Sequence, residues 1–140
     1  ELGYLLNSQK LRELSSDESS IQHGETSINS LIENHPENKN LGDLIFGYNA
    51  LGSLLSKNGF PTVPSFIDRA PKSYEPFFSG GTNTKNYGSK NQNGVDAIQL
   101  ELNRNGIRQD SEDRKRFSKI FAKISIEYMK SNFSDVFPFN

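Results

Sequence analysis

The chain has 140 residues, carries 16 lysine and arginine against 17 aspartate and glutamate residues, and has a net charge of −1. This length suits one domain and is short for two. Acids and bases are interspersed without a polybasic run, and no apolar run is long, so the composition indicates neither a nucleic-acid partner nor a membrane. The absence of cysteine excludes disulfides and thiolate metal sites.

The chain starts at Glu1 and its only methionine is Met129. We therefore expect a processed form, a fragment or a trimmed chain. Residues 1–140 are expected to form either a single domain or the C-terminal portion of a larger one.

The first half of the chain contains short segments that alternate between predicted strand and predicted helix. The apolar stretch 1–6 predicts a short strand, and the apolar residues of segment 21–32 recur near helical spacing, with Thr26 as a cap. Segment 41–46 is expected to be a strand. Leucines at helical spacing over 50–55, followed by Asn58-Gly59, predict a helix and its end.

The second half begins with an extended segment at 62–67 and a polar loop at 68–76. A strand is expected over Val95–Asn103. The last element is a helix with Asp110 as its cap, and its apolar residues form one stripe that we expect to pack on a sheet: Phe117, Ile120, Phe121, Ile124 and Tyr128. Strands alternating with helices predict an α/β fold, a layered mixed sheet with flanking helices.

The predicted strand Val95–Asn103 has two different faces. Ile98, Leu100 and Leu102 share one face, and Gln99 and Glu101 lie on the other. A row of polar side chains on a strand of a layered domain faces either solvent or a site. A glutamate removed from water needs a partner or a chemical task.

A second candidate feature is the pair Gly80-Gly81, which opens a loop rich in hydroxyl and amide groups. It is typical of a tight turn with positive φ. It is also typical of backbone that approaches a ligand. In that case a hairpin-like connection would place the loop beside Glu101, and loop side chains would supply hydrogen bonds: Thr82, Asn83, Thr84, Lys85 and Tyr87.

The glycine-pair loop and the polar-faced strand together resemble a motif of a known protein family. The run from Gly80-Gly81 through Thr84 to Tyr87-Gly88, followed by Ala97-Ile98-Gln99-Leu100-Glu101, resembles the C-terminal motif of the N-formylglutamate amidohydrolase family. Segments 1–6, 51–55 and 63–65 are also similar to parts of that family, in the same order, so the resemblance covers most of the chain.

The resemblance implies a zinc-dependent hydrolase that cleaves an N-acyl amide of a small amino-acid-like substrate. It also implies part of a fold related to zinc carboxypeptidases and aspartoacylases. Zinc would polarise the scissile carbonyl and lower the pKa of its bound water, and Glu101 matches the glutamate that acts as general base. Expected substrate-binding residues are Gly80, Gly81, Thr84, Lys85, Tyr87 and Gln99. Arg104 and Arg108 are candidates for a substrate carboxylate.

The chain also departs from the family pattern. Thr82 replaces an aromatic residue, Lys85 an arginine and Asn86 a histidine. The family's metal ligands precede the segment that matches Glu1, and His23 and His35 lack ligand spacing and are expected at the surface. We therefore expect no metal ligand in this chain, no activity of this chain alone, and an N-terminal companion segment or chain.

The alternative is a non-catalytic binding protein, secreted or structural, that kept the fold and lost the chemistry. Asn132-Phe133-Ser134 is a glycosylation sequon, which matters only in a secreted protein. The sequence does not assign the compartment.

Overall fold

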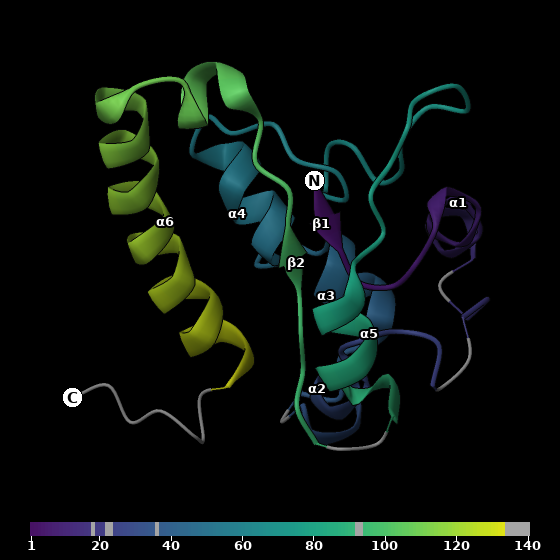
Figure 1. Cartoon of the computed structure of the whole chain (residues 1–140). Helices are drawn as coiled ribbons and strands as arrows, with labels where there is room; N and C mark the ends of the chain where they lie inside the picture. Colours follow the sequence, from purple (N-terminus) through teal and green to yellow (C-terminus); the bar gives the residue numbers. More distant parts are fainter. Residues whose placement is uncertain (18, 22–23, 36, 92–93, 134–140) are drawn as a thin grey trace.

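The computed structural model describes residues 1–17, 19–21, 24–35, 37–91 and 94–133. This part of the chain is a mixed α/β structure in which helices predominate (Figure 1). The strands are β1 (Leu2–Gly3) and β2 (Gln99–Leu100). The helices are α1 (Ser8–Ser16), α2 (Asn29–Asn34), α3 (Leu41–Phe46), α4 (Leu51–Lys57), α5 (Thr82–Tyr87) and α6 (Ser111–Asn132), with short helical turns η1 (Ser89–Asn91) and η2 (Arg104–Arg108).

The sheet joins the start of the chain to a segment about 100 residues later. β1 and β2 pair antiparallel, with Leu2 opposite Leu100 and Gly3 opposite Gln99. The pairing continues to Glu1, whose carbonyl accepts the Glu101 amide at 2.9 Å and whose amino group donates to the Glu101 carbonyl at 2.9 Å. Strands were expected at both places, but among the described residues the sheet has only these two short strands.

The expected strand at 41–46 is wrong, because this segment is helix α3. The Asn40 side chain accepts the Asp43 amide at 2.8 Å and so caps the helix. Leu41, Leu44 and Ile45 are buried at helical spacing. An asparagine directly before a short apolar run favours a helix start, and that signal outweighs the strand-like composition.

The predicted cap of α2 is also wrong. The helix begins after Ile28, whose side chain makes no capping hydrogen bond. Thr26 instead lies in the interior and donates its hydroxyl to the Tyr4 carbonyl at 2.9 Å. This hydrogen bond connects the segment before α2 to the residue that directly follows β1.

Helices α4 and α6 follow the sequence prediction closely. Helix α4 ends at Lys57, with Asn58 as its C-cap, and Gly59 follows with φ of 86°. Asp110 caps α6 by accepting two backbone amides of its first turn, both at 2.9 Å. The apolar stripe of α6 faces inward, but it packs mainly on α4 and η2 rather than on a broad sheet.

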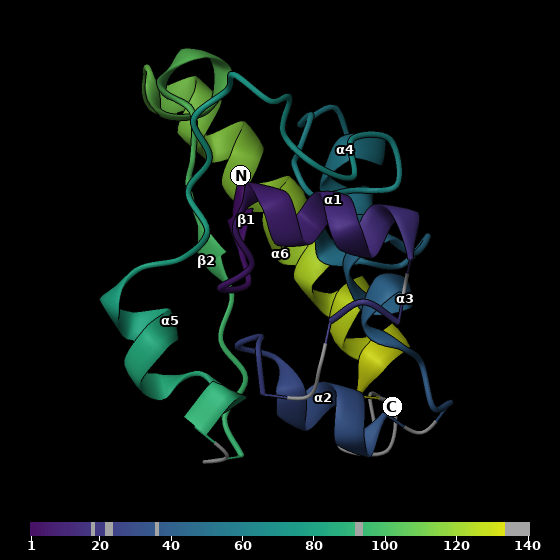
Figure 2. The ribbon, with the colours of Figure 1, turned by 90° about the vertical axis from the view of Figure 1, so that its right-hand side faces the viewer.

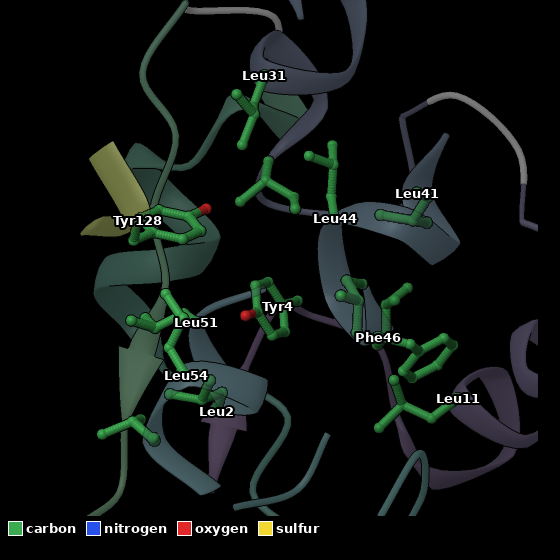
Figure 3. Packing of buried hydrophobic residues seen from close by; sticks show 14 of the residues in the cluster. Leu2, Tyr4, Leu11, Leu31, Leu41, Leu44, Phe46, Leu51, Leu54 and Tyr128 are labelled. Carbon is green, nitrogen blue, oxygen red and sulfur yellow. The ribbon is translucent and has the colours of Figure 1, made fainter. Parts of the chain in front are cut away.

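The core lies between β1 and the helices that surround it. In the view of Figure 2, β2 and α5 lie on the left and α3 and α4 on the right, with β1 between them. Tyr4, which directly follows β1, is 1% exposed and lies at the centre of the packed side chains (Figure 3). Its hydroxyl has no hydrogen-bond partner among the described residues, and burial raises its pKa well above the ordinary value.

Glycines at positions 3 and 80 allow the backbone of β1 and the backbone of the glycine pair to approach each other closely. A Cβ atom on Gly3 would lie 2.6 Å from the Gly80 nitrogen, closer than packed atoms approach. Gly80 itself has φ of 131°, a conformation that favours glycine. The Leu5 amide donates to the Ser79 carbonyl at 2.7 Å. The glycine pair therefore lies directly against the chain that leaves β1.

Candidate functional site

The side chain of Gln99 connects the glycine pair to Glu101. Its Oε1 atom accepts the backbone N–H of Gly81 at 3.2 Å, and its Nε2 atom donates to Glu101 Oε1 at 3.2 Å. Both contacts come from the polar face of β2. The expected placement of the glycine pair beside the polar face of this strand is confirmed, and the connection runs through one glutamine amide.

The residues after Gly81 form helix α5 rather than the expected loop. The Thr84 hydroxyl accepts the Gly81 amide at 2.9 Å and donates to the Gly81 carbonyl at 3.0 Å. Thr84 is buried. The Gly81 N–H is therefore shared between two protein acceptors, and its role in binding a substrate stays a prediction.

Glu101 is exposed and lies at the border of a cavity of about 400 Å³. The carboxylate therefore remains in contact with water, which is one of the two alternatives expected for the polar face of this strand. Glu1 lines the same cavity. The apolar wall comes from the sheet, α4, α6 and η2, and includes Leu2, Leu55, Phe60, Leu100, Leu102, Ile107 and Phe117.

The other predicted side chains divide between two places. Lys85 and Tyr87 are exposed on α5. Tyr87 lines a second hollow, of about 320 Å³, together with Asn83, Thr84 and Gln99. Arg104 and Arg108 are exposed on η2, next in the chain to the cavity-lining residues Asn103 and Ile107. The Arg108 Nε atom donates to the Leu102 carbonyl at 2.8 Å.

The histidines form no metal site in the described part of the chain. His23 lies outside the described residues. His35 is 3% exposed, so its expected surface position is wrong, and its Nδ1 atom accepts the Glu37 amide at 3.1 Å. Its Nε2 atom is buried without a hydrogen-bond partner among these residues. Within them, no group of three or more histidine, cysteine, aspartate or glutamate side chains is arranged to hold a metal ion.

The partly desolvated carboxylate of this region is Asp96, which sequence reasoning did not single out. Its Oδ1 atom accepts the Ser89 hydroxyl at 2.6 Å. Burial raises the pKa of Asp96 above the ordinary value, although hydrogen bonds from Ser89 and from the amides of Leu31 and Ser30 lower it in part. Ser89 also accepts the Ser30 amide at 3.0 Å. Asp96 and Ser89 thus connect the start of α2 to the chain that enters β2.

The raised pKa of Asp96 predicts a specific pH dependence of stability. The folded chain binds this proton more tightly than the unfolded chain, for which the ordinary value is 3.8. The contribution is therefore largest below pH 3.8, declines as pH rises through the folded pKa, and is constant above it. Asp96→Asn removes this titration and keeps an oxygen acceptor for Ser89.

Urea unfolding of both proteins between about pH 3 and pH 7 tests the prediction. The unfolding free energy of the wild type minus that of Asp96→Asn should fall as pH rises. The exposed control Asp68→Asn should keep the wild-type profile. A difference between wild type and Asp96→Asn that is constant or rises with pH contradicts the assignment.

The sequon residue Asn132 is the last residue of α6. It is 4% exposed, and its side-chain nitrogen, the atom to which a glycan would be joined, donates to the Tyr128 carbonyl at 2.9 Å. This nitrogen is therefore buried and already bonded in the structure, and glycosylation of Asn132 stays a prediction. Ser134 lies outside the described residues.

Comparison with known proteins assigns no relative: no family model, no curated protein and no solved structure matches the chain. Among the described helices, none combines the length and apolar character needed to cross a bilayer.

Proposed function

We propose that the chain is the C-terminal part of a zinc-dependent amidohydrolase that cleaves an N-acyl amide of a small amino-acid-like substrate. The proposal starts from the resemblance of residues 80–88 and 97–101 to the N-formylglutamate amidohydrolase motif. One observation carries it: the Gln99 side chain joins Gly81 and Glu101, so the two halves of that motif meet in space. A layered sheet larger than β1 and β2 is part of the same proposal.

In this proposal Glu101 is the general base. Its exposed carboxylate takes a proton from the water whose oxygen adds to the acyl carbon. The C–N bond then breaks, and Glu101 returns the proton to the leaving nitrogen, so the products are a carboxylic acid and an amine. The Gln99 amide, by donating to Glu101 Oε1, orients the carboxylate.

The substrate would lie in the cavity beside Glu101. The apolar wall accommodates a short acyl group, and a volume of about 400 Å³ falls within the range of small-molecule sites. Arg104 and Arg108 are the cationic side chains on η2, next to this wall, and a guanidinium pairs well with a substrate carboxylate. Their roles are part of the proposal.

The described residues do not fit a zinc ion. They contain no cluster of three or more histidine, cysteine, aspartate or glutamate side chains that could hold a metal ion. We therefore propose that the zinc ligands belong to a companion polypeptide segment or chain. The hydrolytic part of the proposal applies to the assembly of the two.

Metal removal tests this function. The assembly of this chain with its companion should release amine from N-formyl or N-acetyl amino acids, lose this activity when a chelator removes the metal, and recover it with zinc. The 140-residue chain alone should be inactive with or without zinc. Hydrolysis by the assembly that survives complete metal removal contradicts the zinc-dependent reaction.

A second candidate, a non-catalytic binding protein with this fold, is favoured by one observation. The Gly81 N–H already donates to the side chains of Thr84 and Gln99. These bonds give the glycine pair a structural role and occupy the N–H group that would bind a substrate. A metal-free assembly that binds N-acyl amino acids without hydrolysing them supports this candidate.

A further inference from the structure

The outer edge of β2 carries unused backbone hydrogen-bonding groups. The backbones of Gln99 and Glu101 face β1 and pair with Gly3 and Glu1. Because successive residues of a strand point their amide groups in opposite directions, the N–H and C=O groups of Leu100 face away from β1, as do those of Ile98. Within the described part of the chain, no hydrogen bond reaches the backbone N–H of either residue.

The apolar surroundings of this edge are only half covered. Ile98, Leu100 and Leu102 pack against the core but remain partly exposed. In Figure 1, β1 lies on one side of β2 and α6 on the other. Ile120 and Phe121 of α6 are also partly exposed. Helix α6 packs on the same core as these strand residues and offers further apolar side chains on which an added strand could pack.

The edge lacks two of the usual protections against pairing, proline and lysine. Proteins block free edges with proline, lysine or a covering segment, yet segment 95–103 contains neither proline nor lysine. The Arg108 side chain donates to the Leu102 carbonyl at 2.8 Å and so ends the open stretch at that residue. A sheet of two strands is also marginal by itself, whereas three or more strands with an apolar face are stable.

We propose that an extended segment of a partner polypeptide adds to β2 as a third strand. Its backbone pairs with Ile98 and Leu100, and its alternate apolar side chains face α6. On the other face a lysine or arginine lies opposite Glu101, because opposite charges favour a cross-strand pair. The partner polypeptide would be the companion of the proposed function, so the identity of the partner rests on that proposal.

The position of α6 selects a lone strand over a second copy of this chain. Because α6 shares its core with Leu100, two copies joined edge to edge through β2 would each bring a 22-residue α6 to the same side of the joined sheet. A single extended segment requires only the width of one strand, about 5 Å. The occupant is therefore an extended segment and not another β2.

Residue-resolved amide hydrogen exchange tests the strand independently of hydrolysis. The probe is a synthetic peptide of alternating valine and lysine with blocked ends. It should slow exchange at Ile98 and Leu100 by at least about tenfold, while Gln99 and Glu101, already bonded to β1, change little. The control peptide has the same sequence with N-methylated valines and cannot complete the ladder, so it should give no protection.

Leu100→Pro removes the outward N–H and leaves the ladder to β1 intact, because proline is tolerated at a strand edge. It should abolish protection of Ile98 by the peptide. If the variant unfolds, comparison of the two peptides on the wild-type chain still tests whether backbone pairing causes the protection.

Unaltered exchange at Ile98 and Leu100 at saturating peptide, or equal effects of both peptides, overturns the proposal. So does protection of these amides that grows with chain concentration in the absence of peptide, since that identifies a second copy. Because exchange is measured without substrate, failure of the strand leaves the hydrolase proposal to its own test.

Discussion

Glu101→Gln in the complete protein is expected to lower kcat by about 10²–10⁴-fold, the usual contribution of a general base. Glutamine keeps the size of the side chain, and its amide oxygen can still accept the Gln99 Nε2 hydrogen bond seen at 3.2 Å. It cannot take a proton from water. The loss should therefore appear in kcat with little change in KM.

Steady-state kinetics with an N-acyl amino acid, together with zinc content, make the comparison. The control is Glu112→Gln, which alters an exposed carboxylate in the first turn of α6, paired with Lys115 at 2.9 Å. It should keep wild-type kcat. Equal kcat for Glu101→Gln and wild type, at equal zinc content, removes Glu101 from the reaction.

Gly52→Ala is expected to destabilise the fold by about 1–3 kcal/mol or more. In an exposed helix this change stabilises by about 1 kcal/mol, because alanine has the higher helix propensity. Here a Cβ atom would overlap the carbonyl oxygen of Pro64 and lie 3.3 Å from a methyl group of Leu2. The clash is with backbone, which cannot rotate away, so α4 must separate from the segment at Pro64.

Urea denaturation with a far-UV signal measures this effect. The comparison variant is Gly59→Ala, where a Cβ atom meets nothing within 4 Å but φ is +86°. That variant should cost only the strain of the backbone conformation, about 1 kcal/mol. An unfolding free energy of Gly52→Ala equal to or above that of the wild type contradicts the close approach of α4 and Pro64.

Local signals predicted the helices with clear ends. The acidic cap and apolar stripe of α6 and the Asn58-Gly59 end of α4 lie in the sequence itself. Short apolar segments were harder. The strand expected at 41–46 is helix α3, because a six-residue buried segment has no periodicity that separates the two structures. The Asn40 cap was the available signal.

The sequence predicted that the glycine pair lies near the polar face of the strand, but it did not predict which carboxylate is buried. The chain order of Gly81 and Gln99 indicated a turn beside a polar strand face, and the structure places them in hydrogen-bonding contact. Exposure could not be deduced, because it depends on what covers the strand. The sequence left Glu101 facing either solvent or a site. The structure exposes Glu101, and the partly buried carboxylate is Asp96, enclosed by Ser89 and the start of α2.

A structure of the complete protein with a bound non-hydrolysable analogue of an N-acyl amino acid tests the assignment of the general base most directly. The proposed reaction predicts that the analogue occupies the cavity between β2, α4 and η2, with its acyl carbon next to a water held by the Glu101 carboxylate. An analogue bound elsewhere, with the Glu101 side chain directed into bulk solvent, would contradict the proposed function.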